Sequence, residues 1–217
     1  MKIRFLGAAG TVTGSRYLLE SKSGEKIRID CGLLQGLKQL RLRNWDKFPV
    51  DPNTISAILL THAHIDHSGY IPRLVQEGFS GEIFCTTPTL ALAEIMLKDS
   101  ARLKEEEADY ANKKKFSKHK PALPLYTQED VEKSLKLFRT KNLKEEFNIG
   151  DFKIKFSEAG HILGAASILI ECDNTKIFFS GDLGRVNDLL ITAPNPPLSA
   201  DYIVMESTYG DRLHAKV

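Results

Sequence analysis

Three histidines and one aspartate lie within six positions of the segment THAHIDHSG: His62, His64, Asp66 and His67. The segment directly follows the apolar run ISAILL, which is typical of a buried strand. In an extended backbone His62 and His64 point the same way, and a tighter turn after them can direct the second pair toward a neighbouring position. Imidazole and carboxylate groups are ligands of zinc and related metals, so this spacing suits two metal ions.

Simpler explanations of the histidine cluster are a His-rich surface loop, a pH-sensitive patch and a purification tag. A tag would lie at a terminus and would lack the aspartate. A solvated loop would not normally follow a buried strand so abruptly. A metal site remains the better interpretation.

Two later segments offer further ligands. His161 lies in EAGHILG and Asp182 lies in FFSGDLG, and each follows a predicted strand and has glycines beside it that allow sharp turns. A single histidine at a strand end is usually structural, and an aspartate between glycines usually forms a turn. Together with the cluster, however, the two residues make a set of candidate ligands.

Composition excludes several other classes of protein. The 217 residues are 42% hydrophobic and 27% charged, which is ordinary for a globular protein with one sizeable core. No apolar run approaches the length of a membrane span, and MKIRFLGAAG at the N-terminus lacks a signal core, so we expect a cytoplasmic protein. The net charge of +2 is too small to indicate that the chain as a whole binds nucleic acid. Cys31, Cys85 and Cys172 have no CxxC spacing and are expected to be reduced core residues.

The pattern along the chain predicts strands, then helices, then strands again. KIRFLG, SRYLLES and EKIRIDCG indicate an antiparallel meander, and GEIFCT indicates a later strand. Helical spacing is present in GYIPRLVQEGF, in a long segment from Pro88 to about residue 115, and in TQEDVEKSLKLF with Thr127 as a possible cap. FKIKFSEA, ASILIEC, TKIFFSGD and YIVMEST indicate the last strands. This order predicts a layered α/β sandwich with loops after the strands free to carry chemistry.

These motifs resemble the ordered signature of the metallo-β-lactamase fold superfamily: Asp30 after a strand, the HxHxDH cluster, GHILG and SGDLG. MESTYGDRLH at 205–214 resembles the first motif of the beta-CASP branch, which includes the endonuclease subunit of the eukaryotic pre-mRNA cleavage machinery and RNA-processing relatives. GAAGTVTGSRYLLE and SARLKEEEADYANKKK are also similar to that branch. The resemblance implies an αββα sandwich, incomplete on its C-terminal side, with residues 1–217 forming a metallo-β-lactamase domain.

The resemblance also implies a role for each candidate residue. His62, His64 and His161 would bind one zinc ion, Asp66 and His67 a second, and Asp182 would bridge the two. Asp30 would not bind a metal itself but would orient the side chains that do. Glu206 would help to position a general-acid histidine, so Asp66, Asp182 and Glu206 are the residues expected in catalysis.

The implied activity is hydrolysis of RNA phosphodiester bonds by a hydroxide that the two zinc ions share. Lactam, thioester and glyoxalase-type hydrolases use similar ligands, but they lack the STYGDR stretch. A DNA-processing nuclease and a non-catalytic subunit of a processing complex also remain open. RNA is the expected partner.

The chain departs from the branch pattern after STYG. In the beta-CASP branch, the STYG motif is followed by a clamp domain, the general-acid histidine and a last histidine ligand of the second metal. This sequence stops at Val217. His214 matches the trailing part of the motif and is not assigned to the missing ligand. We expect these residues to be the catalytic portion of a longer protein, with an under-occupied second zinc site and an apolar seam that favours self-association, including a homodimer.

Overall fold

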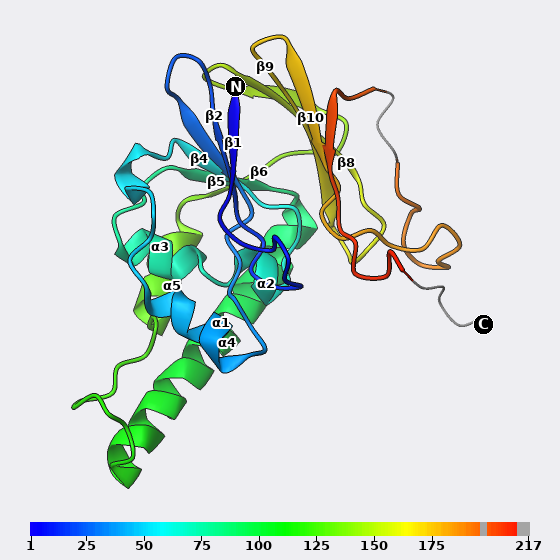
Figure 1. The fold of residues 1–217 in the computed structure, drawn as a ribbon. Helices are drawn as coiled ribbons and strands as arrows, with labels where there is room; N and C mark the ends of the chain where they lie inside the picture. Colours follow the sequence, from blue (N-terminus) through cyan, green and yellow to red (C-terminus); the bar gives the residue numbers. More distant parts are fainter. Residues whose placement is uncertain (196–198, 212–217) are drawn as a thin grey trace.

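Two mixed β-sheets and a group of helices make up the computed structural model, which describes residues 1–195 and 199–211 (Figure 1). The six-stranded sheet has its strands in sequence order: β1 (Lys2–Phe5), β2 (Tyr17–Glu20), β3 (Lys26–Ile29), β4 (Ala57–Leu59), β5 (Glu82–Cys85) and β6 (Phe138–Thr140). Strands β1 to β3 are antiparallel, and β3 to β6 are parallel.

The second sheet has five strands in the order β11-β10-β9-β8-β7. They are β7 (Glu146–Ile149), β8 (Phe152–Glu158), β9 (Ala166–Cys172), β10 (Thr175–Phe179) and β11 (Tyr202–Val204). Neighbours are antiparallel except for β10 and β11, which run parallel. The parallel pair brings the residues after both strands to the same end of the sheet.

The helices all lie in the segment between β3 and β6. They are α1 (Lys38–Leu42), α2 (Ile65–Ser68), α3 (Ile71–Gln76), α4 (Thr87–Lys114) and α5 (Gln128–Leu135), with short 3-10 turns at Arg43–Trp45 and Pro52–Thr54. In the described part of the chain after Thr140 there is no helix. The described residues therefore provide one helical layer and both sheets of the predicted αββα sandwich.

The side chains of β4 point alternately into two hydrophobic cores. Ile58 packs in the core between the six-stranded sheet and the helices, whereas Ala57 and Leu59 pack in the core between the two sheets. Successive side chains of a strand point to opposite faces, so a strand that is apolar at every position must be covered on both sides. The run ISAILL therefore forms a strand buried in the middle of the molecule, immediately before the histidine cluster.

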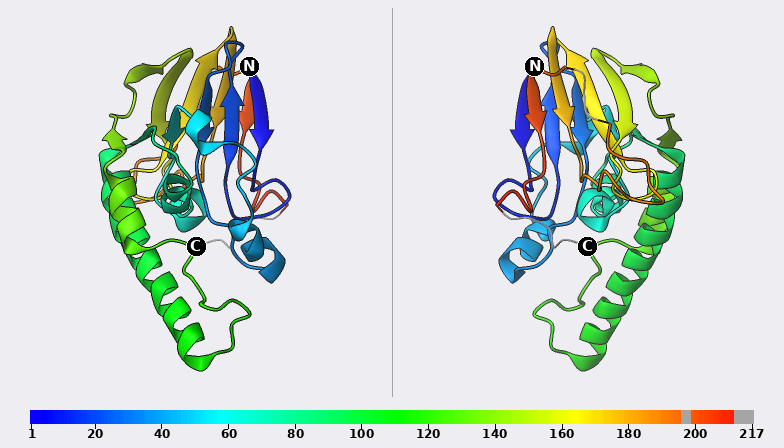
Figure 2. Two further views of the ribbon diagram at one scale, coloured as in Figure 1. Left: turned by 90° about the vertical axis from the view of Figure 1, so that its left-hand side faces the viewer. Right: turned by 90° about the vertical axis from the view of Figure 1, so that its right-hand side faces the viewer.

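Helix α4 is the longest element and extends well beyond the rest of the molecule (Figure 2). It begins where the side chain of Thr86 accepts a hydrogen bond from the backbone N–H of Thr89, with Pro88 in the first turn. It ends at Lys115, which adopts a left-handed conformation with φ 54°. Oγ1 of Thr86 and Oγ1 of Thr89 also donate hydrogen bonds to the carbonyl oxygen of Gly164, at 2.6 and 2.9 Å. The start of α4 is thus attached to the loop that carries His161.

The predicted fold class is confirmed, and the differences concern short elements. The sequence predicted a helix through Phe138, but α5 ends at Leu135 and Phe138 begins β6, where it pairs with Ile83. Pairing with a distant strand overrides the local helical spacing there. The three cysteines are buried and free, as expected. In the described residues, no helix is both long and apolar enough to cross a membrane.

Candidate metal centre

The candidate ligands meet because each follows a strand at the same end of the sandwich. Asp30 follows β3, His62 follows β4, His161 lies shortly after β8 and Asp182 lies shortly after β10. His64 is the residue before α2, whose first turn carries Asp66 and whose last turn carries His67. The predicted tight turn after His64 is therefore a short helix. It places the second ligand pair beside the first.

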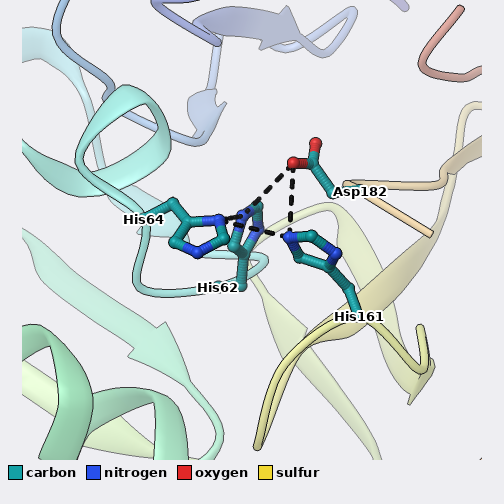
Figure 3. A group of neighbouring side chains, drawn as sticks. All are labelled: His62, His64, His161 and Asp182. Carbon is teal, nitrogen blue, oxygen red and sulfur yellow. Dashed lines mark hydrogen bonds and ion pairs between the residues drawn. The ribbon is translucent and has the colours of Figure 1, made fainter. Parts of the chain in front are cut away.

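Four side chains form the first donor set: His62, His64, His161 and Asp182 (Figure 3). Nδ1 of His64 lies 3.1 Å from Nε2 of His62 and 3.2 Å from Nε2 of His161. Oδ2 of Asp182 lies 3.6 Å from Nε2 of His62 and 3.5 Å from Nε2 of His161. A tetrahedral zinc ion with bonds of about 2.0–2.1 Å has its donors about 3.4 Å apart. The donor types and their spacing therefore fit one tetrahedral ion.

The other oxygen of Asp182 faces a second donor set. Oδ1 of Asp182 lies 3.2 Å from Nε2 of His67, and Oδ2 of Asp66 lies 3.9 Å from the same nitrogen. The two oxygens of Asp182 thus face different histidines. This is the arrangement expected of a carboxylate that lies between two ions, and the second set offers one imidazole and two carboxylates.

Asp30 holds the histidines from behind. Its Oδ2 accepts a hydrogen bond from Nδ1 of His67 at 2.7 Å and another from Oγ of Ser15 at 3.1 Å. Its Oδ1 accepts from the backbone N–H of Thr61 at 2.8 Å and from Oγ1 of Thr61 at 2.9 Å. Oγ1 of Thr61 is also 3.0 Å from Nδ1 of His62. Because Nδ1 of His62 and Nδ1 of His67 are held in this way, Nε2 of these two rings is left for a metal.

Backbone strain occurs at the same residue. Asp30 has a φ of 57°, in the left-handed region that few residues other than glycine adopt. Its side chain is 1% exposed and its backbone N–H donates to the carbonyl oxygen of Leu59. These hydrogen bonds compensate for the strain, which is typical of functional sites.

The charges around the site raise some pKa values and lower others. Burial and the charge of His67 hold the pKa of His62 well below its usual value, and burial together with His161 lowers the pKa of His64. Burial acts in the same direction on His67, but Asp30 and Asp182 outweigh it and raise the pKa of His67 to about 10. Burial would raise the pKa of Asp182, but hydrogen bonding and charge from His67 lower it overall. A metal at the second set must therefore displace a tightly held proton from His67.

Glycine is required where the ligand-bearing loops touch. A Cβ atom on Gly184 would overlap the carbonyl oxygen of Gly160, which precedes His161. A Cβ atom on Gly32 would overlap the carbonyl oxygen of Asp66. Any side chain at these two positions would push the loops, and with them the ligands, apart.

Glu206 lies beside the site but contacts the backbone instead of a histidine. Its Oε1 accepts a hydrogen bond from the backbone N–H of Leu183 at 2.7 Å, so it holds the residue after Asp182. That Glu206 positions a general-acid histidine stays a prediction, and His214 lies outside the described residues. Glu206 also lines an open groove of about 1200 Å³ that includes Asp66, His67, His161, Asp182 and residues 205–210.

A sequence profile described as the Metallo-beta-lactamase superfamily matches residues 9–209. The chain belongs to this superfamily. Ribonuclease TTHA0252 of Thermus thermophilus is 37% identical over 215 residues, which are 99% of this chain and 45% of that protein. Cleavage and polyadenylation specificity factor 73 of Drosophila melanogaster is 33% identical over 222 residues, covering all of this chain and 30% of the fly protein. This chain thus spans less than half the length of either relative.

Among solved structures, a metallo-β-lactamase from Cronobacter sakazakii aligns with a TM-score of 0.49 and 21% identity, over 83% of this chain and 61% of that one. The two sequence relatives confirm the resemblance to the RNA-processing branch.

The sequence predicted the residues of both donor sets, and the structure brings all of them together. The sequence did not predict the roles of Thr61 and Ser15, which donate hydrogen bonds to Asp30. Thr61 could have been noticed, because it directly precedes His62 in the cluster. Ser15 gave no such signal, since it is fifteen residues from Asp30 in sequence.

Proposed function

We propose that this chain hydrolyses phosphodiester bonds of RNA, using two zinc ions. The observation that carries the proposal is the pair of adjacent donor sets that share Asp182 at one side of an open groove. When bound, two such ions supply Lewis acidity, activate water and stabilise both the attacking and the leaving oxygen of a displacement at phosphorus.

The chain's own residues prepare the site. Thr61 and Asp30 hold the Nδ1 atoms of His62 and His67, so that the Nε2 atom of each of these two rings is left for a metal. Asp182 directs one oxygen to each donor set and sets their separation. Preorganised ligands need no rearrangement when the substrate binds. The site can therefore stabilise the charge that develops in the transition state without a reorganisation cost.

The shape of the groove and the relatives support a polymeric substrate. The groove is open, and its lining includes Arg185 and residues of the loop between β1 and β2, such as Thr11 and Val12. An open groove admits a chain that continues on both sides of the reacting bond. The relative from Thermus thermophilus is named a ribonuclease, which supports RNA over lactams or thioesters as the substrate.

The deciding experiment measures cleavage of a labelled single-stranded RNA by the zinc-loaded chain. Cleavage should be slow but should require zinc, and it should be absent after chelation and in Asp182→Ala. A DNA strand of the same sequence and a chromogenic cephalosporin are assayed in parallel. Absence of RNA cleavage at saturating zinc, or hydrolysis of the cephalosporin alone, would overturn the proposal.

A further inference from the structure

A concentrated patch of positive charge lies at the far end of α4. Residues 113–120, here called the basic tip, read KKKFSKHK and contain five lysines and one histidine but no acidic residue. Without these five, the chain's thirty basic side chains fall to twenty-five, against twenty-eight acidic ones. The rest of the chain is thus slightly acidic in sum. The basic tip lies at the projecting end of α4 and in the turn that follows it (Figure 2).

The lysines of the basic tip are available to a ligand. Lys113, Lys114, Lys115, Lys118 and Lys120 are all exposed. Among the ion pairs of the described residues, none includes a lysine of the basic tip. Some lysines elsewhere in the described residues do form ion pairs, for example Lys98 with Glu94 and Lys153 with Glu146. Like charges brought together without counter-charges attract a polyanion.

Two aromatic rings stand beside these lysines. Tyr110 is 58% exposed and Phe116 is 66% exposed, and their centroids are 6.0 Å apart with an interplanar angle of 60°. Nζ of Lys114 lies 5.9 Å from the centre of the Tyr110 ring. Large exposed rings are unfavourable in water unless something covers them, and a nucleic-acid base is a flat partner for such a ring.

The backbone of the tip is held in place. Nδ2 of Asn112 donates to the carbonyl oxygen of Ala122 at 3.0 Å, and the backbone N–H of Ala122 donates to Oδ1 of Asn112 at 2.7 Å. This amide clamp returns the chain to the helix, so that Phe116 and the lysines after it are presented on a closed loop. A ligand would therefore meet a formed surface.

From the charge, the rings and the clamp, we propose that the basic tip binds single-stranded RNA, with lysines on the phosphates and Phe116 against a base. The inference rests on the proposed function and adds a second binding surface for the same substrate. Helix α4 starts beside the loop that carries His161, because Thr89 is bonded to Gly164. The 24 residues from Thr89 to Lys113 place the basic tip about 36 Å from that loop, at about 1.5 Å per residue. A stacked strand spans that distance with about ten nucleotides, at about 3.4 Å each.

The test measures RNA binding in metal-free protein, where no cleavage can occur. The tip variant replaces Lys113, Lys115, Lys118 and Lys120 by Gln. The control variant replaces four ion-paired lysines by Gln: Lys98, Lys133, Lys153 and Lys176. Fluorescence anisotropy with a labelled single strand of about twenty nucleotides gives the affinity at several salt concentrations.

The tip variant should bind at least about tenfold more weakly at low salt, and the slope of log affinity against log salt should fall by about 0.7 for each phosphate that the variant no longer binds. The control should stay close to the unmodified chain. Phe116→Ala keeps the charge and should bind at least about fivefold more weakly, because a base no longer has a ring to stack on. Equal binding by tip and control variants would overturn the inference, as would displacement of the RNA by a polyglutamate peptide at equal charge concentration.

A cleavage assay distinguishes failure of this inference from failure of the proposed function. With zinc, the tip variant should cut a strand of about twenty nucleotides more slowly than the control does, and a strand of about six nucleotides at the same rate. If the unmodified chain binds RNA through the tip but cuts nothing, only the proposed function fails. If it cuts both lengths equally well with and without the tip lysines, only this inference fails.

Discussion

Nδ1 of His67 donates a hydrogen bond to Oδ2 of Asp30 at 2.7 Å, across 37 positions of sequence. Asp30 is 1% exposed and also accepts hydrogen bonds from Thr61 and Ser15, so its carboxylate is fixed. The bond decides which nitrogen of His67 can bind a metal. It leaves Nε2 facing Asp66 and Asp182.

Asp30→Asn should therefore impair the second metal more than the first. The amide keeps the shape and an acceptor for Thr61, but its NH₂ group must face Nδ1 of His67 and would place the imidazole proton on Nε2. We expect about a 10- to 100-fold loss of affinity at the second site, measured by zinc titration with a chromophoric chelator. Equal weakening of both sites would contradict the role given to Asp30.

The stability of the metal-free chain should depend on pH through His67. Burial lowers its pKa, but Asp30 and Asp182 raise it to about 10, above the ordinary value of 6.5. The stabilisation from its protonated form is thus fully present below pH 6.5 and is lost as pH rises toward 10. Relative to His67→Gln, the free energy of unfolding should fall by a few kcal/mol over that range.

Urea denaturation of both proteins with chelator present measures the effect. His62, whose pKa burial lowers, is neutral in the folded chain over this range and is neutral in the unfolded chain too above about pH 7.5, so it does not contribute there. A difference between the two proteins that stays constant from pH 6.5 to about pH 9.5 would show that His67 is not held as a cation.

The candidate ligands could be predicted because their types and spacing carry the chemistry. His62, His64, Asp66 and His67 are contiguous enough to identify alone, and the strand that precedes them is apolar at every position. His161 and Asp182 became convincing only as members of a set. Their meeting depends on β8 and β10 ending at the same edge, which follows from the layered order of strands and helices.

Other features depend on long-range pairing that leaves no local pattern. Strand β6 has three residues and exists because Phe138 pairs with Ile83 in β5. Glu206 reaches the backbone of Leu183 because β11 lies parallel to β10. The motif indicated that Glu206 belongs to the site, but its partner could not be read from the sequence.

Replacing Glu206 tests whether it positions the loop of Asp182. Glu206→Gln keeps an acceptor for the N–H of Leu183, whereas Glu206→Ala leaves that N–H without its partner. We expect the alanine variant to lose about 10- to 100-fold in zinc affinity and the glutamine variant to stay near the unmodified chain. If Glu206 acts by its charge or by proton transfer, both variants will lose RNA cleavage equally while zinc affinity stays unchanged in both.

Two buried arginines should respond to the same substitution with opposite signs. Arg28 is fully buried over the ring of Phe48, and its three guanidinium nitrogens have no hydrogen-bond partner among the described residues. Arg16 is also buried, but it donates to the carbonyl oxygen of Gly32 and to Oδ1 of Asn44. Arg28→Met should raise the free energy of unfolding by about 1–3 kcal/mol, since it removes a buried charge that has no hydrogen-bond partner in the described part of the chain.

Arg16→Met should instead lower the free energy of unfolding by about 2 kcal/mol or more, since it removes the donor to the buried carbonyl oxygen of Gly32 and leaves Oδ1 of Asn44 with only the backbone N–H of Leu34 as a donor from the described residues. Thermal and urea unfolding of the two variants provides the comparison. A loss of stability in both would mean that the guanidinium of Arg28 is solvated or paired within the folded chain.

Asp182 and His67 differ in how many ions they should affect. Asp182 faces His62 and His161 with Oδ2 and His67 with Oδ1, whereas His67 faces only the second set. Asp182→Ala should therefore lower the occupancy of both sites, and His67→Ala should leave the first site occupied. Plasma mass spectrometry of zinc per chain, after dialysis against a weak chelator, distinguishes the two. If both variants lose the same amount of zinc, Asp182 does not lie between two ions, and the division of the ligands into two sets is wrong.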